Sequence, residues 1–357
     1  MHRIERLHAS LEDVPAASSF DRIVRRACDD TLGLSSDDGR CRFVLREHVI
    51  EELRRLPDHL LPRYLFYRYR YEVFPQTHEV DGFPPCLQIE PTSICNYRCV
   101  FCYQTDRQLT SPGNGHMGLM SLDLFKRVID EAEGRCEAVT LASRGEPLMA
   151  RQITEMLGYL RGKFVAAKVN TNAWFLDEAK AHALLEADLN TLVFSADAAE
   201  PELYGRLRVN GRLDRVLANV EMFARIRERD YPTSRTITRV SGVRVGGQQD
   251  IASMQAVWGG LVDQVAFVDY QPWENTYERP LSAVDAPCSD LWRRMFVWWD
   301  GRINPCDVDY RSTLSGGRLG DTTLADAWRG EAYDRLRAAH VNGGRSQQHP
   351  CNRCTLV

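Results

Sequence analysis

The sequence predicts an α/β protein, built as a partial (β/α)6 TIM-like barrel with a helical N-terminal extension and a small cysteine-rich C-terminal domain. Three observations support this fold class. Six strand-like segments alternate with helical ones between residues 86 and 276, residues 1–85 carry helical patterns, and the tail from residue 277 is rich in turns and cysteines. Strands that alternate with helices form a parallel sheet, and right-handed crossovers curl such a sheet into a barrel. We therefore expect three domains, over residues 1–85, 86–276 and 277–357.

The N-terminal extension carries two helical patterns, and each ends where a helix-breaking residue follows. The first, SFDRIVRRACDDTLG, ends at Gly33, and the second, REHVIEELRRL, ends before Pro57. An aromatic stretch follows between Tyr64 and Phe74, and such side chains most often pack a segment onto a neighbour. The pattern leaves open whether the extension caps the barrel, binds substrate or forms a dimer.

The barrel follows from the strand-like segments. They span residues 86–90, 137–142, 164–170, 191–196, 236–245 and 264–270, and the helical patterns between them span 122–134, 153–162, 178–187, 215–228 and 253–261. The loops after parallel strands gather at the C-terminal edge of the sheet, where a site is expected. In the tail, one helix is expected over residues 323–340, and so little core remains that bound metal would stabilise this domain.

Composition and charge disfavour several classes of function. The 357 residues are 44% hydrophobic and 26% charged, and the net charge of −4 provides no basic surplus for binding nucleic acid. The longest apolar runs fall short of the about 18 residues of a membrane-spanning helix. The segment MHRIERLHASLEDVP lacks the apolar core of a signal peptide. We therefore expect a cytoplasmic protein that binds neither nucleic acid nor membranes.

Three cysteines within eight residues follow the first strand: Cys95, Cys99 and Cys102. Three thiolates do not fill the four positions of a zinc ion, and the nearest histidine, His116, lies across a Gly/Pro-containing loop. On a [4Fe–4S] cluster, three thiolates ligate three irons and leave the fourth open. An open iron allows a cofactor or substrate to coordinate, so the sequence predicts a reactive cluster at this loop.

This cysteine motif, with the aromatic Phe101 before its last cysteine, resembles the signature of the radical S-adenosylmethionine (radical SAM) enzymes. The resemblance extends over about 190 residues. It implies a [4Fe–4S] cluster whose open iron binds S-adenosylmethionine, which is cleaved to a 5′-deoxyadenosyl radical after one electron arrives from a flavodoxin- or ferredoxin-type donor. The protein then binds and orients the cofactor and the substrate, and it excludes water from the site.

Further segments resemble the cofactor-binding segments of this family, in the same order along the chain. Ser143-Arg144-Gly145-Glu146-Pro147 resembles its GGEP segment, although Ser-Arg replaces the first glycine and leaves Arg144 with no assigned role: it contacts a carboxylate or an anionic substrate, or caps the loop. The resemblance implies cofactor contacts from Phe101, Gly145, Glu146, Pro147, Asn170, Asn172, Ser195, Asp197 and Arg208.

A second set of four cysteines lies in the tail: Cys288, Cys306, Cys351 and Cys354. Four thiolates saturate either zinc or a second iron–sulfur cluster, and spacing alone leaves both open. The surrounding sequence resembles the SPASM/Twitch domains of radical SAM enzymes, and its order and spacing are similar to those of the 2-deoxy-scyllo-inosamine dehydrogenases. This resemblance implies one auxiliary [4Fe–4S] cluster in a Twitch-like iron–sulfur domain. Full ligation would leave the cluster to transfer electrons or to support the structure.

The resemblance implies radical oxidation of a small polyhydroxylated substrate, such as a sugar, nucleotide sugar or aminocyclitol. Hydrogen abstraction from a carbinol, loss of the hydroxyl proton and electron transfer to the auxiliary cluster would give a ketone. Candidate substrate-facing residues, one of which could be the base, end the last two strands: Arg244, Asp269, Tyr270 and Glu274.

Three other functions remain open. A redox-neutral epimerase or dehydratase is the first, and an epimerase often uses a cysteine thiol to return hydrogen. Cys86 and Cys136 are expected at the barrel bottom, which leaves Cys28 and Cys41. A ribosomal-peptide maturase is the second, although residues 1–85 lack the three-strand start of a winged-helix recognition domain. The third is a binding protein stabilised by zinc.

Overall fold

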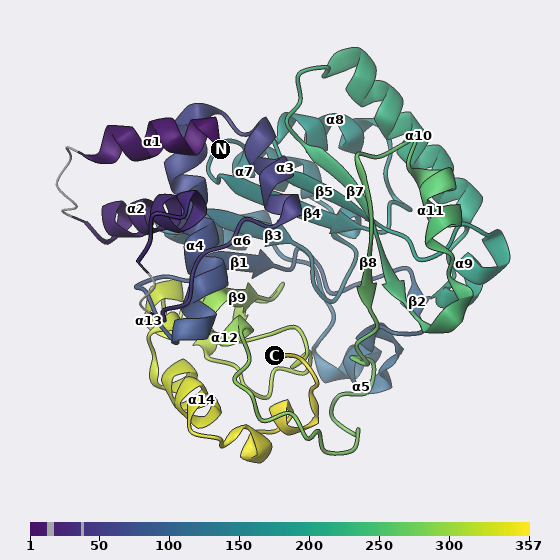
Figure 1. The fold of residues 1–357 in the computed structure, drawn as a ribbon. Helices are drawn as coiled ribbons and strands as arrows, with labels where there is room; N and C mark the ends of the chain where they lie inside the picture. The colour runs from purple at the N-terminus through teal and green to yellow at the C-terminus, as the bar shows by residue number, and fades with distance from the viewer. Residues whose placement is uncertain (13–17, 37–38) are drawn as a thin grey trace.

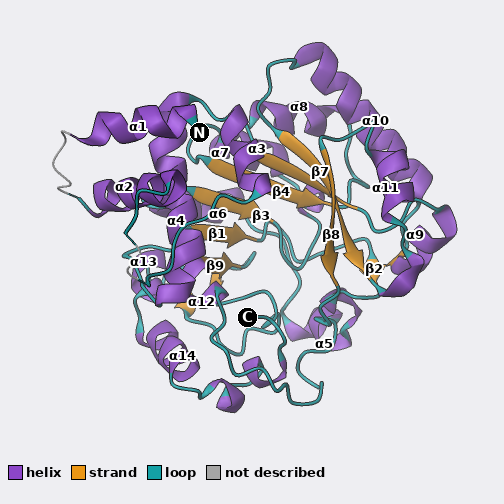
Figure 2. Cartoon of the chain, in the orientation of Figure 1, coloured by secondary structure: helices purple, strands orange, loops and turns teal. Residues whose placement is uncertain are grey.

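The computed structural model describes residues 1–12, 18–36 and 39–357. Six parallel strands form the barrel sheet in the order β1-β3-β4-β5-β7-β8, as the sequence predicts. They span β1 Cys86–Ile89, β3 Ala138–Leu141, β4 Ala166–Thr171, β5 Thr191–Ser195, β7 Ile237–Arg244 and β8 Gln264–Asp269. Figures 1 and 2 show the sheet with helices around it, which confirms the predicted fold class.

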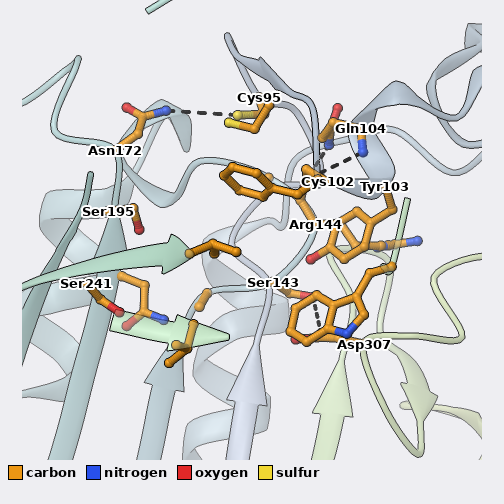
Figure 3. A pocket seen from close by; sticks show the side chains of 18 of the residues that line it. Cys95, Cys102, Tyr103, Gln104, Ser143, Arg144, Asn172, Ser195, Ser241 and Asp307 are labelled. Carbon is orange, nitrogen blue, oxygen red and sulfur yellow. Dashed lines mark hydrogen bonds between the residues drawn. The ribbon is translucent and has the colours of Figure 1, made fainter. Parts of the chain in front are cut away.

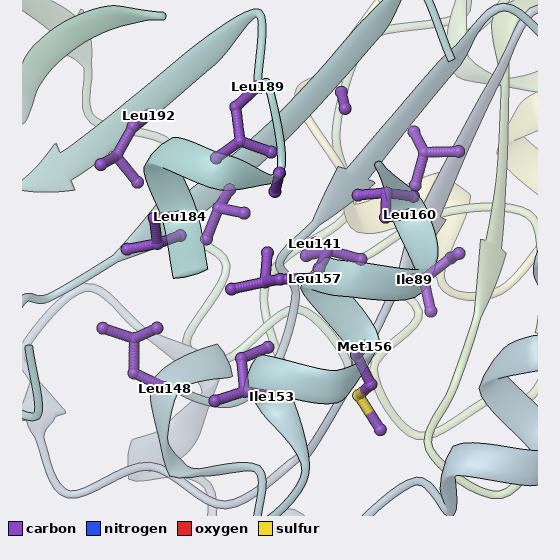
Figure 4. Packing of buried hydrophobic residues seen from close by; sticks show 14 of the residues in the cluster. Ile89, Leu141, Leu148, Ile153, Met156, Leu157, Leu160, Leu184, Leu189 and Leu192 are labelled. Atoms are coloured by element: carbon purple, nitrogen blue, oxygen red, sulfur yellow. The ribbon is translucent and has the colours of Figure 1, made fainter. Parts of the chain in front are cut away.

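Helices between these strands cover the outer face of the sheet (Figure 2). They are α6 Leu122–Ala132, α7 Ile153–Leu160, α8 Glu178–Glu186, α9 Pro201–Leu207, α10 Leu213–Asp230 and α11 Ile251–Trp258. Figure 4 shows Leu141 of β3 beside Leu157 of α7, and Ile89 of β1 and Leu184 of α8 belong to the same buried cluster. All four side chains are almost fully buried, so removal of this apolar surface from water stabilises the layered packing.

The N-terminal extension is helical, as predicted, and packs against the N-terminal ends of the barrel strands. Its helices are α1 His2–Glu12, α2 Ser19–Leu32, α3 Glu47–Arg55 and α4 Leu61–Thr77. The next helix, the short α5 Arg107–Thr110, belongs to the loop region after β1. Tyr67 and Tyr71 of α4 belong to one buried cluster with Cys86, Ala138 and Ala166 of the strands. The aromatic stretch therefore closes the bottom of the barrel.

The C-terminal segment extends the barrel sheet. Strand β9, Arg294–Val297, lies parallel beside β1, and the sheet continues through β10, Arg302–Asn304, to β11, Gly317–Arg318. The remaining helices are α12 Asp290–Arg293, α13 Leu324–Trp328 and α14 Glu331–Val341 (Figure 1). The single helix expected over residues 323–340 is therefore wrong. It breaks at Gly330, whose extended backbone (φ −81°, ψ 164°) is incompatible with a helix.

No helix in the described part of the chain combines the length and apolar character needed to cross a membrane.

Candidate active site

A cavity of about 820 Å³ opens at the C-terminal edge of the strands, where the sequence predicts a site. The three cysteines of the first set line one end of it. Side chains from β1, β3, β4, β5, β7 and β8 line its wall, and residues from the tail close it on the opposite side. Figure 3 shows Cys95 and Cys102 above, with Ser195 and Ser241 on one side and Asp307 on the other.

The loop that carries the three cysteines is held in place by backbone contacts. Strand β2, Arg98–Cys99, pairs with β6, Arg208–Val209, so Cys99 lies opposite Arg208. Backbone amides of Tyr97 and Gln104 donate to the sulfurs of Cys95 (3.4 Å) and Cys102 (3.5 Å). Amide donors of this kind favour thiolates, which are the form that binds iron.

Burial makes these thiolates costly in the absence of a positive charge. It raises the pKa of Cys95 to about 12 and that of Cys102 further still. A bound metal centre compensates this cost because coordination deprotonates thiols outright. The donor set of three soft sulfurs facing one cavity therefore fits a cluster with an open iron.

The segment after β3 lies directly against the cysteine loop because it contains a glycine. A Cβ on Gly145 would come within 2.2 Å of the Thr92 carbonyl oxygen and 2.7 Å of the Ile94 carbonyl oxygen. The Glu146 carboxylate, buried beside it, accepts hydrogen bonds from Thr171 Oγ1 (2.5 Å), the Asn172 amide (2.7 Å) and the Leu148 amide (3.0 Å). Both Glu146 oxygens are thus engaged within the protein, and they fix the end of β4.

The end of β4 presents two asparagines. Asn172 donates from Nδ2 to Asn96 Oδ1 (2.9 Å) and accepts from the Trp174 amide, which holds it beside the cysteine loop. Asn170 lines the cavity, and its buried Oδ1 accepts no hydrogen bond from the described residues. Buried acceptors normally have partners. This orphaned oxygen, together with Ser195 on the next strand, therefore fits a polar cofactor such as S-adenosylmethionine.

Asp197 and Arg208, both expected to contact the cofactor, form a buried ion pair with each other. Arg208 Nε lies 2.5 Å from Asp197 Oδ2, and the Val243 amide donates to Asp197 Oδ1 (2.6 Å). Arg208 lines the cavity, 3.8 Å from the Cys99 sulfur, and its guanidinium lies over the Phe101 ring. Asp197 is not among the lining residues. It acts as a positioning residue for Arg208.

Pro147 is also absent from the cavity lining; it is buried at the start of a short 3-10 turn, Pro147–Met149.

Arg144, which the sequence left without a role, connects the barrel to the C-terminal domain. Its guanidinium donates to both carboxylate oxygens of Glu90 (2.6 and 2.7 Å) and to the Tyr310 carbonyl (2.9 Å), and it lies over the Trp298 ring. Arg144 and Glu90 are both buried. The replacement of glycine by Ser-Arg therefore provides a buried ion pair within the barrel, and the same guanidinium contacts Tyr310 and Trp298 of the C-terminal domain.

The floor of the cavity contains charged residues that the sequence did not single out. Asp307 accepts hydrogen bonds from Gln88 Nε2 (2.6 Å) and Ser143 Oγ (2.7 Å), and burial raises its pKa to about 6. Lys168 and Arg294 also line the floor. Lys168 lies two residues before Asn170 on one face of β4, so strand alternation could have indicated it.

The four substrate-facing candidates occupy different positions. Asp269 lines the cavity at its exposed rim, and Arg244 pairs with it at 3.5 Å without being among the lining residues. The Tyr270 hydroxyl donates to Glu274, and burial and this carboxylate raise the pKa of Tyr270 to about 12. Neither residue of that pair is among those that line the cavity. The structure thus brings only Asp269 to the cavity.

The second set of cysteines surrounds a smaller cavity. Cys288, Cys306, Cys351 and Cys354 all line it. Arg345 fastens the surrounding loops through the carbonyls of Ala286 (2.6 Å) and Cys354 (3.1 Å). In the described part of the chain, no three His, Cys, Asp or Glu side chains gather as tightly as a single metal ion requires. A [4Fe–4S] cluster takes one thiolate per iron, and four free cysteines facing one cavity fit that donor set.

Two family models match the chain. Residues 89–242 match the radical SAM superfamily, and residues 288–355 match the SPASM iron–sulfur cluster-binding domain. The second match supports a cluster over the zinc alternative at the four C-terminal cysteines.

Curated relatives share parts of this sequence. A GTP 3′,8-cyclase of Desulforamulus reducens is 23% identical over 52% of this chain, and one of Hydrogenovibrio crunogenus is 30% identical over 38%. An Fe-coproporphyrin III synthase of Methanosarcina barkeri is 30% identical over 32%. The matches span 55%, 40% and 27% of these relatives' own lengths, so the chain covers about half of them or less.

Solved structures share the fold. SuiB of Streptococcus suis, bound to the precursor peptide SuiA, aligns with a TM-score of 0.59 at 16% identity, covering 90% of this chain and 80% of SuiB. BtrN in complex with AdoMet and 2-DOIA aligns with a TM-score of 0.54 at 15% identity, covering 78% of this chain and 95% of BtrN. The predicted resemblance to an aminocyclitol dehydrogenase therefore extends to the fold alone.

Motif, geometry and family models agree on the same two groups of cysteines. The chain therefore contains a radical SAM domain over residues 89–242 and a SPASM iron–sulfur cluster-binding domain over residues 288–355. These domains indicate S-adenosylmethionine and [4Fe–4S] clusters as cofactors.

Proposed function

We propose that this protein dehydrogenates a carbinol of a small polyhydroxylated substrate, with the auxiliary cluster as electron acceptor. One observation carries the proposal: a single cavity is lined by the three cysteines at one end and by the hydroxyl and amide side chains of successive strands along its wall. Such a wall suits a ligand with several hydroxyl groups, because each hydroxyl needs a donor or acceptor when it leaves water.

The cofactors supply the 5′-deoxyadenosyl radical that takes a hydrogen atom from the substrate, and an acceptor for the second electron. The residues of this chain bind and orient the cofactor and the substrate. Asn170 and Ser195 face the cavity beside the cysteines, and Arg208 presents its guanidinium near Cys99, where it suits the cofactor carboxylate. Asp269 at the rim is our candidate for the group that accepts the substrate hydroxyl proton.

The placement of Leu356 supports a role of the auxiliary site in the reaction. Leu356 lines both the large cavity and the cavity of the second cysteine set. Its amide donates to the Cys354 sulfur (3.4 Å), and the neighbouring Thr355 donates to Gln271 of the large cavity's wall (2.7 Å). One segment thus borders both sites, which supports the auxiliary cluster as the electron acceptor.

The remaining cysteines favour oxidation over epimerisation. Cys28 and Cys136 are fully buried, Cys86 is packed under the floor, and Cys41 contacts Gln76 near the surface. None of the four is among the residues that line the cavity. Thus no thiol outside the two cysteine sets is placed, in the described part of the chain, to return a hydrogen atom to the substrate.

The test begins with protein reconstituted anaerobically, with iron, sulfide and zinc counted per chain. We expect about eight irons and no zinc, and reductive cleavage of S-adenosylmethionine to 5′-deoxyadenosine. Sugars and aminocyclitols are then screened, and the expected result is one ketone for each 5′-deoxyadenosine formed. Products that retain the substrate's oxidation state would instead establish a redox-neutral reaction, and cleavage that depends on a precursor peptide would establish a peptide maturase.

A further inference from the structure

The floor of the large cavity is a polar layer above an apolar one. Strand register places Gln88, Thr140 and Lys168 side by side on β1, β3 and β4. Two residues earlier on each strand, Cys86, Ala138 and Ala166 pack on the aromatic side chains of α4. Lys168 is therefore in the first layer that faces the cavity, with the closed barrel bottom beneath it.

Lys168 is a cation with no partner in this layer. It makes no hydrogen bond and no ion pair with any residue in the described part of the chain, although two further lining cations, Arg144 and Arg208, each pair with a buried carboxylate. Asp307, the acid on the floor, is already engaged by Gln88 and Ser143. Lys168 is half-buried, and it lines the cavity without a partner from the protein. An anionic ligand group could therefore form a charge-assisted hydrogen bond with it.

A second cation backs Lys168 from the far side of β1. Arg294 lines the same floor; its Nε lies 3.9 Å from Asp290, and its guanidinium donates a hydrogen bond to the Tyr71 hydroxyl. Burial and the positive charge of Arg294 lower the pKa of Lys168 to about 8, against weaker opposing effects of Cys86 and Glu52. Of the charged residues that line the floor, Lys168 and Arg294 are cations and Asp307 is an acid, whose hydrogen-bond partners Gln88 and Ser143 are neutral. The lining of the floor therefore carries more positive than negative charge.

We propose that Lys168, backed by Arg294, binds an anionic group of the substrate, so that the substrate is a polyhydroxylated carboxylate or phosphate. This inference rests on the proposed function and narrows its substrate class. An oxyanion at the floor would leave the hydroxyl groups of the substrate beside Ser195 and Ser241 on the wall. A substrate amine, in contrast, would meet like charge, which argues against an aminocyclitol.

Binding to the reconstituted protein tests this, with S-adenosylmethionine present and calorimetry as the readout. The probes are D-glucose, D-glucosamine, D-glucuronate, D-glucose 6-phosphate and inorganic phosphate; the last three distinguish a carboxylate from a phosphate. We expect at least one anionic probe to bind about tenfold or more tightly than D-glucose, and D-glucosamine to bind most weakly. Lys168→Gln is expected to abolish this preference, and Lys168→Arg to retain most of it.

A control variant and a second measurement, reductive cleavage of S-adenosylmethionine, distinguish failure of this inference from failure of the proposed function. Lys163→Gln removes a lysine that pairs with Glu133 outside the cavity, and it should leave the preference unchanged. Equal binding of neutral and anionic probes, no binding of any anion, or loss of S-adenosylmethionine affinity in Lys168→Gln would each overturn the inference. Reductive cleavage of S-adenosylmethionine should persist in Lys168→Gln. Its absence from the wild-type protein would refute the proposed function itself.

Discussion

At the scale of single residues, the site depends on a few positions where no other side chain fits. Gly145 is the clearest, because the carbonyls of Thr92 and Ile94 occupy the space of a side chain. This close approach keeps the segment after β3 in contact with the loop of the first cysteine set. It also places Glu146 where it can accept hydrogen bonds from Thr171 and Asn172.

Gly145→Ala is expected to destabilise the protein by about 1–3 kcal/mol, because the added methyl group forces the two loops apart. It should also weaken binding of S-adenosylmethionine. Chemical denaturation and equilibrium binding measure the two effects. Gly158→Ala is the control: Gly158 lies in α7 with nothing within 4 Å of a Cβ, so the substitution should stabilise by about 0.5–1 kcal/mol. Similar effects of both substitutions would contradict the prediction.

At the scale of elements, one carboxylate joins α3, α10 and β7. Asp263 lies 3.0 Å from Arg55 and 2.8 Å from Arg227, and it accepts a hydrogen bond from the Thr238 amide (2.7 Å). These arginines and hydrogen bonds hold the pKa of Asp263 well below its usual range, despite partial burial. The N-terminal extension is thereby attached to the last strands of the barrel.

Asp263 makes the folded protein less stable at acidic pH. Because its pKa is depressed in the folded protein, its contribution is fully present above the unfolded pKa of about 4 and is lost as pH falls below that value. Asp263→Asn should therefore cost about 2 kcal/mol at pH 7 and flatten the loss of stability below pH 5. Denaturation curves at several pH values measure this. Asp214→Asn, at an exposed pair with Arg212, should change neither quantity.

The alternation of residues along the strands predicts much of the site. The site residues that it does not predict depend on contacts between segments far apart in the sequence. The cysteines, Asn170 and Ser195 follow from their positions at strand ends. Lys168 was not predicted, because a charged residue inside a strand resembles a solvent-facing one. The contacts of Arg144 with Trp298 and the Tyr310 carbonyl depend on β9 lying beside β1, about 200 residues away in the chain, and local patterns carry no such information.

At the scale of the whole molecule, Arg144 attaches the C-terminal domain to the barrel. Arg144→Ala leaves the buried Glu90 without its partner, which should cost about 3–5 kcal/mol. Hydrogen exchange should then increase in residues 294–318, where this domain meets β1. The control is Arg335→Ala, which removes an exposed pair with Glu331 on α14. Unchanged exchange in Arg144→Ala would show that the sheet alone holds the domain.

The two cysteine sets should be separable by function. Cys306→Ala is expected to reduce the iron content from about eight to about four per chain, since each set holds one four-iron cluster. Reductive cleavage of S-adenosylmethionine should continue, while formation of the ketone should stop. Iron analysis and product analysis on the same sample measure both. Continued ketone formation in this variant would exclude the auxiliary cluster as the electron acceptor.

The pairing of β9 with β1 has a consequence for how the molecule can be divided. Without β9, the backbone amides and carbonyls of β1 that it satisfies would face water as an open strand edge. Such an edge recruits strands from other molecules and promotes aggregation. The SPASM domain thus supplies the strand that pairs with the first barrel strand. A fragment ending at residue 276 would expose the edge of β1 and be prone to aggregation.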